Sequence, residues 1–322
     1  MFEIITDTSA NLDCEWLEAH RVGVVPFHFY TAGEDQTCTD TRGFDGRAFY
    51  EAMRSGAKVS TSQITSQDFD SCFRPLLQTG RDLLFVSMSS GISGSFHQAC
   101  ISAEELMGEF PGRKILLVDT LSASLGEGLL VLLAVNGRDA GDSLETVYRR
   151  LQETRMDMCQ IFTVDDLNYL RATGRLSNAA ALVGSLLGIK PLLKGNEKGR
   201  IVSFAKLRGR KKAISAMAEE YDRLVKNPES QTVGIAHADC GDDAAALAAL
   251  LRRNHPPREI LTVMYEPVTG SHVGPGTLAL FFFGDPSFRS EKNTLAQLTE
   301  GKRDQLLAVL RSHRGQKSSE DS

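Results

Sequence analysis

The sequence predicts an α/β protein built from two α/β domains, with a parallel sheet in the first and a mixed sheet in the second. Short apolar runs alternate with segments of helical periodicity through the first half, which is the pattern of a parallel sheet covered on both faces. The chain of 322 residues is also long for one ordinary domain. We place the domains at residues 1–158 and 159–287, followed by a polar extension, 288–322, that we expect to be partly disordered.

The first domain is predicted from apolar strands that end in polar residues. The predicted strands are residues 2–6, 23–29, 83–86 and 114–118. The predicted helices are residues 45–56, 67–77 and 96–108, with a leucine-rich helix after residue 120. Ligands of parallel sheets lie at the carboxyl ends of the strands, so we expect four polar residues to gather at one rim: Asp7, Thr61, Ser93 and Asp119.

The second domain repeats the alternation of strands and helices with different spacing. Its predicted strands are residues 160–164, 201–205, 232–236, 260–265 and 278–283. Its predicted helices are residues 211–226 and 242–253. A strongly apolar segment, 179–187, is rich in small residues and ends at Gly188 and Pro191.

Composition excludes several classes of protein. A net charge of −5 argues against a nucleic-acid partner. The six cysteines are scattered without a C-x-x-C pair, which suits neither a zinc site nor a disulfide-stapled secreted domain. No signal peptide and no apolar run long enough for a transmembrane segment are visible. We therefore expect a cytoplasmic protein with no metal and no cofactor.

The most informative stretch is residues 87–95, where hydroxyls and glycines stand between a predicted strand and a predicted helix. Unpaired backbone N–H groups point outward at the start of a helix, and its dipole favours a negative ligand. Glycines such as Gly91 and Gly94 let that ligand approach the backbone closely. The stretch predicts a binding seat for a small anion.

The stretch has two other interpretations. A serine hydrolase would use Ser93 as nucleophile with an acid and with His237 or His272. The nucleophile elbow requires G-x-S-x-G, and here Gly94 comes one place too early. The second alternative is a serine-rich helix cap with a purely structural role.

Three further motifs carry less weight. Residues 274–279 match the dinucleotide fingerprint as a string, but they open an apolar strand instead of a helix, so we reject nucleotide binding. The basic run 206–212 is either a solvated face or a docking site for an acidic partner or a phosphate, and Arg171 and Arg175 could add to it. We expect His272 in a loop before a Gly-Pro-Gly turn, and on its own it is weak evidence for a functional site.

Taken together, several motifs resemble those of the DegV family of bacterial fatty-acid-binding proteins. The matching segments follow one another in order from residue 6 to about 284. They are residues 6–9, 61–63, 89–95, 119–126, 165–175, 189–191, 208–212, 237–239 and 272–277. The chain departs from the family pattern modestly, with Thr173 in place of a commoner glycine and a longer C-terminal tail.

The resemblance implies a fatty acid lying between the two domains. It makes Thr61 and Ser93 hydroxyl donors to the carboxylate, assisted by the Gly94 N–H and completed by His272. It also implies that two arginines serve docking of, and phosphotransfer from, a separate fatty acid kinase: Arg175 and Arg208. Hydroxyls and N–H groups can satisfy a buried carboxyl group without burying a fixed cation.

The function expected from the sequence is therefore a carrier that binds a long-chain fatty acid and presents it to a kinase that makes the acyl phosphate. Such a protein is not itself an enzyme, it needs no cofactor, and it allows transient contact with a membrane. The acyl chain needs an apolar tunnel, whose expected walls are residues 179–193 and 278–283. The alternative is a serine hydrolase, an acyl esterase, that uses Ser93.

Overall fold

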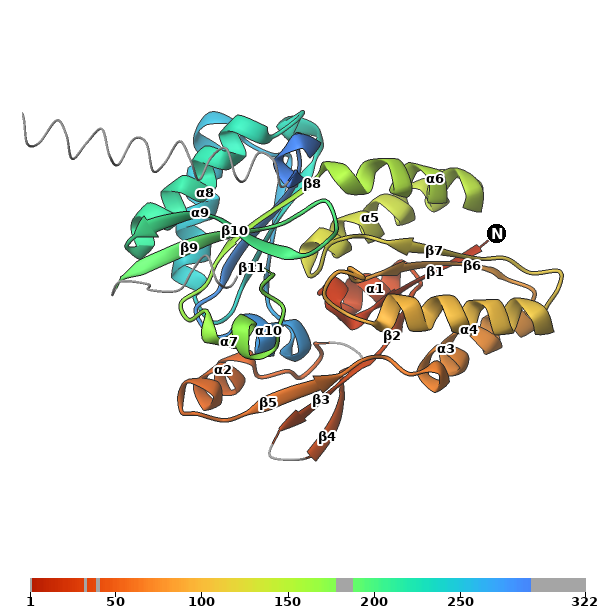
Figure 1. The fold of residues 1–322 in the computed structure, drawn as a ribbon. Helices are drawn as coiled ribbons and strands as arrows, with labels where there is room; N and C mark the ends of the chain where they lie inside the picture. The colour runs from red at the N-terminus through yellow and green to blue at the C-terminus, as the bar shows by residue number, and fades with distance from the viewer. Residues whose placement is uncertain (1, 32–33, 39–40, 178–187, 291–322) are drawn as a thin grey trace, which may run out of the picture.

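The computed structural model describes residues 2–31, 34–38, 41–177 and 188–290 (Figure 1). They form two α/β units, as predicted, each organised around its own sheet. The first unit contains a four-stranded sheet in the order β2-β1-β6-β7, and all of its neighbouring strands are parallel. The strands are β1 (Phe2–Asp7), β2 (Val22–Val25), β6 (Asp82–Ser87) and β7 (Ile115–Asp119).

Helices cover both faces of this parallel sheet. Ile4 and Ile5 are both fully buried but belong to different apolar clusters, because successive strand residues point to opposite faces. One face packs against α3 (Ser66–Gln78) and α4 (Ser95–Glu109). The other packs against α5 (Leu125–Asp139) and α6 (Leu144–Thr154), while α1 (Cys14–Ala19) joins β1 to β2.

A small antiparallel sheet stands beside the parallel one and carries Thr61. Its order is β4-β3-β5, formed by β3 (Phe27–Thr31), β4 (Glu34–Cys38) and β5 (Val59–Ser62), with α2 (Gly46–Arg54) between β4 and β5. The single strand predicted over residues 23–29 is wrong, because β2 ends before Pro26 and β3 begins after it. Proline has no N–H to donate to a ladder, and here it marks the point where the chain changes sheets.

The second unit contains a mixed six-stranded sheet in the order β10-β9-β8-β13-β11-β12. Only the β11–β12 pair is parallel. The strands are β8 (Met158–Thr163), β9 (Ile189–Gly195), β10 (Ile201–Arg208), β11 (Thr232–His237), β12 (Glu259–Met264) and β13 (Leu278–Phe283). Its helices are α7 (Asn168–Ala172), α8 (Arg210–Leu224), α9 (Gly241–Asn254) and α10 (Pro267–Val273).

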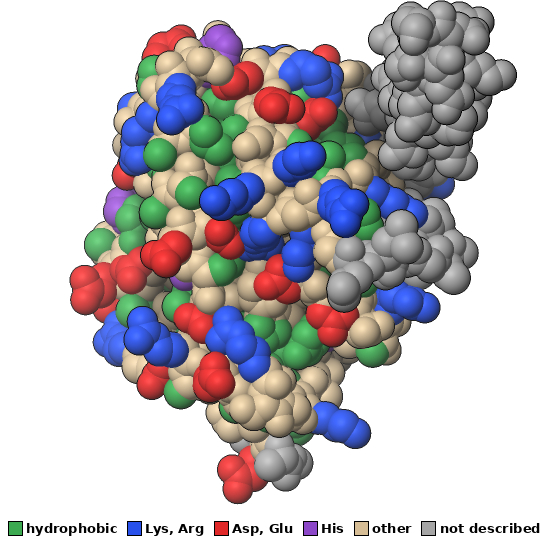
Figure 2. Space-filling model, turned by 90° about the vertical axis from the view of Figure 1, so that its left-hand side faces the viewer, with side chains coloured by type: hydrophobic (Ala, Val, Ile, Leu, Met, Phe, Trp, Pro, Cys, Tyr) green, Lys and Arg blue, Asp and Glu red, His purple; other side chains and the backbone are tan. Residues whose placement is uncertain are grey.

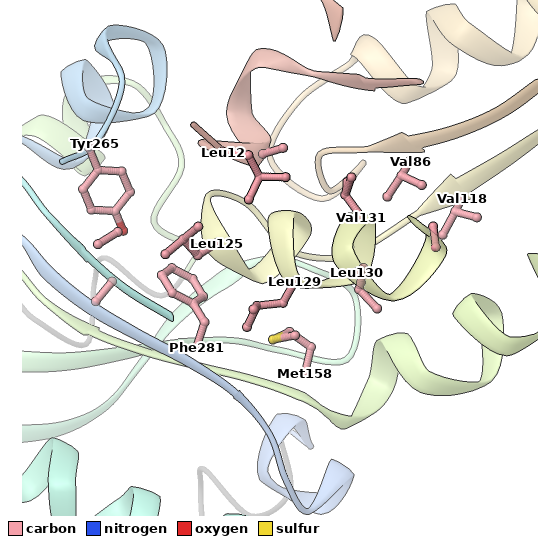
Figure 3. Packing of buried hydrophobic residues seen from close by; sticks show 14 of the residues in the cluster. Leu12, Val86, Val118, Leu125, Leu129, Leu130, Val131, Met158, Tyr265 and Phe281 are labelled. Carbon is pink, nitrogen blue, oxygen red and sulfur yellow. The ribbon is translucent and has the colours of Figure 1, made fainter. Parts of the chain in front are cut away.

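The two sheets share one apolar core across helix α5. Leu125 and Leu129 of α5 point toward Phe281 and Met158 of the mixed sheet (Figure 3). On the other side of the helix, Val131 points toward Val86 of the parallel sheet (Figure 3). This position explains why α5 is apolar around most of its circumference. A second cluster lies between α8, α9 and the opposite face of the mixed sheet.

Three sequence expectations need comment at this level. His272 lies in α10 and not in a loop, because the N-cap Glu266 and the following Pro267 start a short helix there. Phe288 and Arg289, which we assigned to the polar extension, are buried in the second unit as part of the short 3-10 turn η5 (Pro286–Arg289). The apolar segment 179–187 lies outside the described residues.

Candidate ligand-binding site

A cavity of about 470 Å³ lies between the two units. Both units supply its walls. The apolar residues among them are Phe27, Met88, Ile92, Ala123, Phe162, Leu170, Ile201, Tyr265, Val268, Val273 and Phe281. Its polar residues include Thr61, Gln63, Ser93, Gln160, Arg175 and His272. A cavity of this size with a few polar groups on an apolar wall is the usual form of a small-molecule site.

Thr61 and His272 meet across the domain boundary. Thr61 comes from β5 of the small sheet and His272 from α10, and their Oγ1 and Nε2 atoms are 2.9 Å apart. Both residues line the cavity. The structure therefore brings together two predicted site residues that are far apart in the sequence.

His272 is held in its neutral form. Burial, and secondarily the nearby Arg175, lowers its pKa to about 4. Its Nδ1 is buried without a hydrogen-bond partner among the described residues. An orphaned buried N–H is rarer than an orphaned acceptor, so we assign the proton to Nε2, which then donates to Thr61 Oγ1. The Thr61 hydroxyl proton is thereby left to donate into the cavity.

Ser93 and Gly94 stand at the amino end of α4. Gly94 is the N-cap residue of this helix of 15 residues and gives it no side-chain cap. The helix dipole therefore presents its positive end beside the cavity. Gly94 also accommodates Gln63, because a Cβ at this position would collide with Oε1 of that side chain. Gln63 lines the cavity and was missing from the residues predicted from the sequence to bind the ligand.

Asp7 and Asp119 brace the loop that carries Ser93, and neither lines the cavity. Asp7 Oδ2 accepts a hydrogen bond of 2.9 Å from the Met88 N–H, and Asp119 Oδ1 accepts one of 3.1 Å from the Ser90 N–H. The four residues expected at one rim thus divide into two that face the cavity and two that support the loop. The sequence pattern alone did not distinguish these roles.

The two arginines expected to serve a partner lie far apart. Arg175 lines the cavity, where its Nε donates to the Ile92 carbonyl over 3.3 Å. Arg208 is exposed at the far end of β10 from Ile201, which bridges to Leu176. A strand rises about 3.3 Å per residue, so the two arginines are on the order of 20 Å apart. A cation therefore stands at the cavity wall, where we expected only hydroxyls and N–H groups.

Some residues of the basic run are exposed to solvent, and another forms ion pairs within the protein. Lys206, Arg208, Lys211 and Lys212 are exposed. Arg210 instead pairs with Asp243 at 2.8 Å and with Asp165 at 3.5 Å. Figure 2 shows the left-hand face of the molecule, with Lys and Arg side chains gathered across its middle. Asp and Glu side chains lie among them, and the exposed residues of the basic run are the ones that offer positive charge to an acidic surface.

The predicted acyl walls are partly wrong. Phe281 of residues 278–283 lines the cavity, as expected. In the other predicted wall, residues 179–187 lie outside the described residues. Residues 188–193 do not contribute, because Leu192 and Leu193 are buried in the core on either side of β9. The remaining apolar wall comes from residues scattered over both units, which no single apolar run in the sequence could indicate.

A hydrolase arrangement is not formed in the described residues. Ser93 Oγ donates to Ser95 Oγ over 3.0 Å, while His272 is engaged with Thr61. His237 Nδ1 accepts a hydrogen bond from the Cys240 N–H, and Asp239 pairs with Arg54. A catalytic serine needs a histidine within hydrogen-bond reach, and no described contact supplies one.

Two other searches of the described residues bear on function. No group of three or more His, Cys, Asp or Glu side chains there could hold a metal ion. No described helix is both long enough and apolar enough to cross a membrane.

The fold and the site define a two-unit α/β protein with a largely apolar cavity that carries a few polar side chains between the units. This chain belongs to the DegV family: the family model, described as "Uncharacterised protein, DegV family", matches residues 1–285. A DegV domain-containing protein of Clostridium perfringens is 41% identical over 239 residues, covering 74% of this chain and 82% of that protein.

Solved structures of similar proteins agree with the fold. A fatty-acid-binding DegV family protein from Thermus thermophilus is 29% identical and has a TM-score of 0.80, covering 88% of this chain and 99% of that one. DegV of Bacillus subtilis, described as a fatty acid binding protein, is 28% identical and has a TM-score of 0.76. The match covers 87% of this chain and 98% of the Bacillus subtilis chain.

Proposed function

We propose that this protein binds a long-chain fatty acid in the cavity between its two units. The observation that carries the proposal is the polar end of the cavity, where the Thr61–His272 pair and the start of α4 face an otherwise largely apolar wall. Fatty acid binding by relatives of 28% and 29% identity supports the same ligand class here.

The carboxylate would lie at this polar end. Thr61 would donate its hydroxyl proton, and Ser93 would turn its own from Ser95 Oγ toward the carboxylate. The Gly94 N–H would add a third donor, and His272 would orient Thr61. Hydrogen bonds to a charged group are shorter and stronger than those between neutral groups. Arg175 on the cavity wall adds a favourable positive charge.

The acyl chain would occupy the apolar remainder of the cavity. Burial of each CH₂ contributes about 0.8 kcal/mol, so a long chain binds tightly with few polar contacts. Phe162 and Phe281, on neighbouring strands of the mixed sheet, would form one wall. Val268 and Val273 of α10 would contribute another.

A site that binds a fatty acid and carries no described catalytic arrangement suits a carrier better than an enzyme. In this proposal the Ser93 hydroxyl holds a carboxylate and attacks nothing, and its described contact is with another serine. We propose that the carrier presents the carboxylate to a separate fatty acid kinase, which forms the acyl phosphate in the cytoplasm. The exposed basic residues at the end of β10 and the start of α8 would contact an acidic surface of that kinase.

The binding proposal is tested by native mass spectrometry of the purified protein before and after addition of oleate. We expect a single bound fatty acid that is released intact by organic solvent. Ser93→Ala should raise the dissociation constant roughly 5- to 150-fold, which corresponds to about 1–3 kcal/mol for a hydrogen bond to a charged group. Ser143→Ala, at the exposed N-cap of α6, is the matched control and should leave the affinity unchanged.

Failure of this proposal has a distinct signature. A protein that takes up no fatty acid and hydrolyses an acyl ester in a Ser93-dependent manner would be a hydrolase and not a carrier.

The transfer proposal is tested with a purified bacterial fatty acid kinase and ATP, following acyl phosphate formation on the loaded protein. Arg208→Ala should slow the reaction about tenfold. It should leave the affinity for oleate unchanged, because Arg208 is exposed and does not line the cavity. Arg149→Ala, an exposed arginine on α6 at the other side of the molecule, should change neither quantity. Loss of oleate binding in Arg208→Ala would contradict a docking role.

A further inference from the structure

The turn η5 carries a buried cation behind the cavity. Arg289 has 0% of its surface exposed, and it forms no ion pair with any described residue. Its guanidinium donates instead to backbone carbonyls of four residues: Leu121, Arg155, Met158 and Asn196. Burial lowers its pKa to about 10, so it is charged at neutral pH.

Two of these carbonyls belong to loops beside the carboxylate seat. Nη2 donates to the Leu121 carbonyl at 2.6 Å and to the Asn196 carbonyl at 3.0 Å. Leu121 directly precedes residues 122–124, which line the cavity, and its carbonyl also accepts from the cavity residue Gln160. Asn196 opens the turn between β9 and β10, which includes the lining residue Gly199.

Both loops then hold the same residue of the seat, Ser89. The Ser89 N–H donates to the Ser122 carbonyl over 2.8 Å, and the Ser89 Oγ donates to the Gly199 carbonyl over 2.9 Å. Ser89 belongs to the loop that leads to Ser93 and α4. The Arg289 backbone strengthens the arrangement, because its carbonyl accepts from the Glu197 N–H over 3.0 Å.

We propose that Arg289 is a positioning residue for the carboxylate seat, acting through the loop at residues 119–124 and the turn at residues 196–199. Those two segments come from different units of the molecule, so one guanidinium fixes the spacing between them. A planar fork of five donors reaches several carbonyls at once, which the single ammonium of lysine does not do. Arg289 lies beyond the segment matched by the family model, residues 1–285.

The test compares Arg289→Met with Arg138→Met. Arg138 is the matched control because it too is buried and donates to backbone carbonyls, those of His20 and Arg21, away from the cavity. Each variant is assayed well below its melting temperature, by displacement of a fluorescent fatty acid with oleate and by hydrogen exchange of the ligand-free protein. Arg289→Met should weaken binding by about tenfold or more and speed exchange at residues 119–124 and 196–199. Arg138→Met should do neither.

Equal affinities in the two variants, or equal losses, would overturn the proposal. If Arg289→Met does not fold, Arg289→Lys keeps the charge and should show the same two effects in weaker form. The affinity measurement rests on the proposed function, whereas the exchange measurement does not. A wild-type protein that binds no fatty acid would refute the proposed function, and the exchange rates would still decide the role of Arg289.

Discussion

At the scale of single residues, the properties of the site depend on the protonation states of its buried side chains. The low pKa of His272 keeps the ring neutral, so it can orient Thr61 without adding a buried charge. Asp7, Glu127 and Glu266 are buried carboxyl groups whose pKa values are raised by desolvation. These three carboxyl groups do not line the cavity.

His272 predicts a specific pH dependence of stability in the ligand-free protein. A histidine whose pKa falls from 6.5 to about 4 on folding stays neutral while the unfolded chain becomes protonated. Its contribution to stability is complete above pH 6.5 and is lost as the pH falls toward 4. Since the ring is only partly exposed, we expect a loss of about 1–3 kcal/mol in urea unfolding between these pH values.

His272→Gln should remove this pH-dependent contribution to the free energy of unfolding. The free energies of unfolding of the variant and the wild type should therefore differ less as the pH falls. The carboxyl groups with raised pKa values act in the opposite sense and are common to both proteins, so they cancel in the comparison. His97→Gln, an exposed histidine on α4, is the control. If the difference in free energy of unfolding between His272→Gln and the wild type stays the same from pH 7 to pH 4, the prediction is wrong, because folding then does not change the pKa of the ring.

At the scale of elements, the backbone of the loop before α4 packs closely against the turn between β9 and β10. A Cβ on Gly91 would lie 2.6 Å from the carbonyl carbon of Gly199 and would also collide with the Lys198 carbonyl oxygen. Both neighbours are backbone atoms, which cannot turn away as a side chain does. Glycine is required at this position by the approach of another chain segment.

Gly91→Ala should therefore destabilise the protein by about 1–3 kcal/mol, the usual cost of overpacking. It should also weaken oleate binding, because the loop that carries Ser93 must move. Gly108→Ala is the control, since a Cβ there meets nothing within 4 Å and alanine favours the helix. Urea unfolding of the two variants makes the comparison, and equal stabilities would contradict the packing argument.

At the scale of the whole molecule, the two units are joined by more than the cavity. The core around α5 draws residues from both sheets (Figure 3). Helix α2 also contacts the second unit: Tyr50 donates to the Tyr265 carbonyl at 2.9 Å, and Arg54 pairs with Asp239 at 2.5 Å. The cavity thus lies in a continuous structure, and Arg289 is one of several residues that span the boundary.

Much of the fold was predictable because its strands and helices carry strong local patterns. The buried strands β1, β6 and β13 are short apolar runs, and α4 and α9 have helical periodicity and clear ends. The sequence did not indicate α1, α6, β4 and β5, and it also missed the strand β9 and the helix α10. β9 is interrupted by Pro191 and Lys194 in its sequence, and α10 has only 7 residues, too few for a period to show.

By itself, the sequence determined the α/β class and the two-unit organisation, and it predicted an anion seat around Ser93, since these follow from local periodicity and from residues adjacent in the chain. Only the tertiary structure decided that Thr61 meets His272, that Arg175 faces the cavity, and that Arg289 lies buried behind the seat. Each of these depends on a contact between residues far apart in the chain. Such contacts are set by the packing of whole sheets and helices, and no local pattern of residues records them.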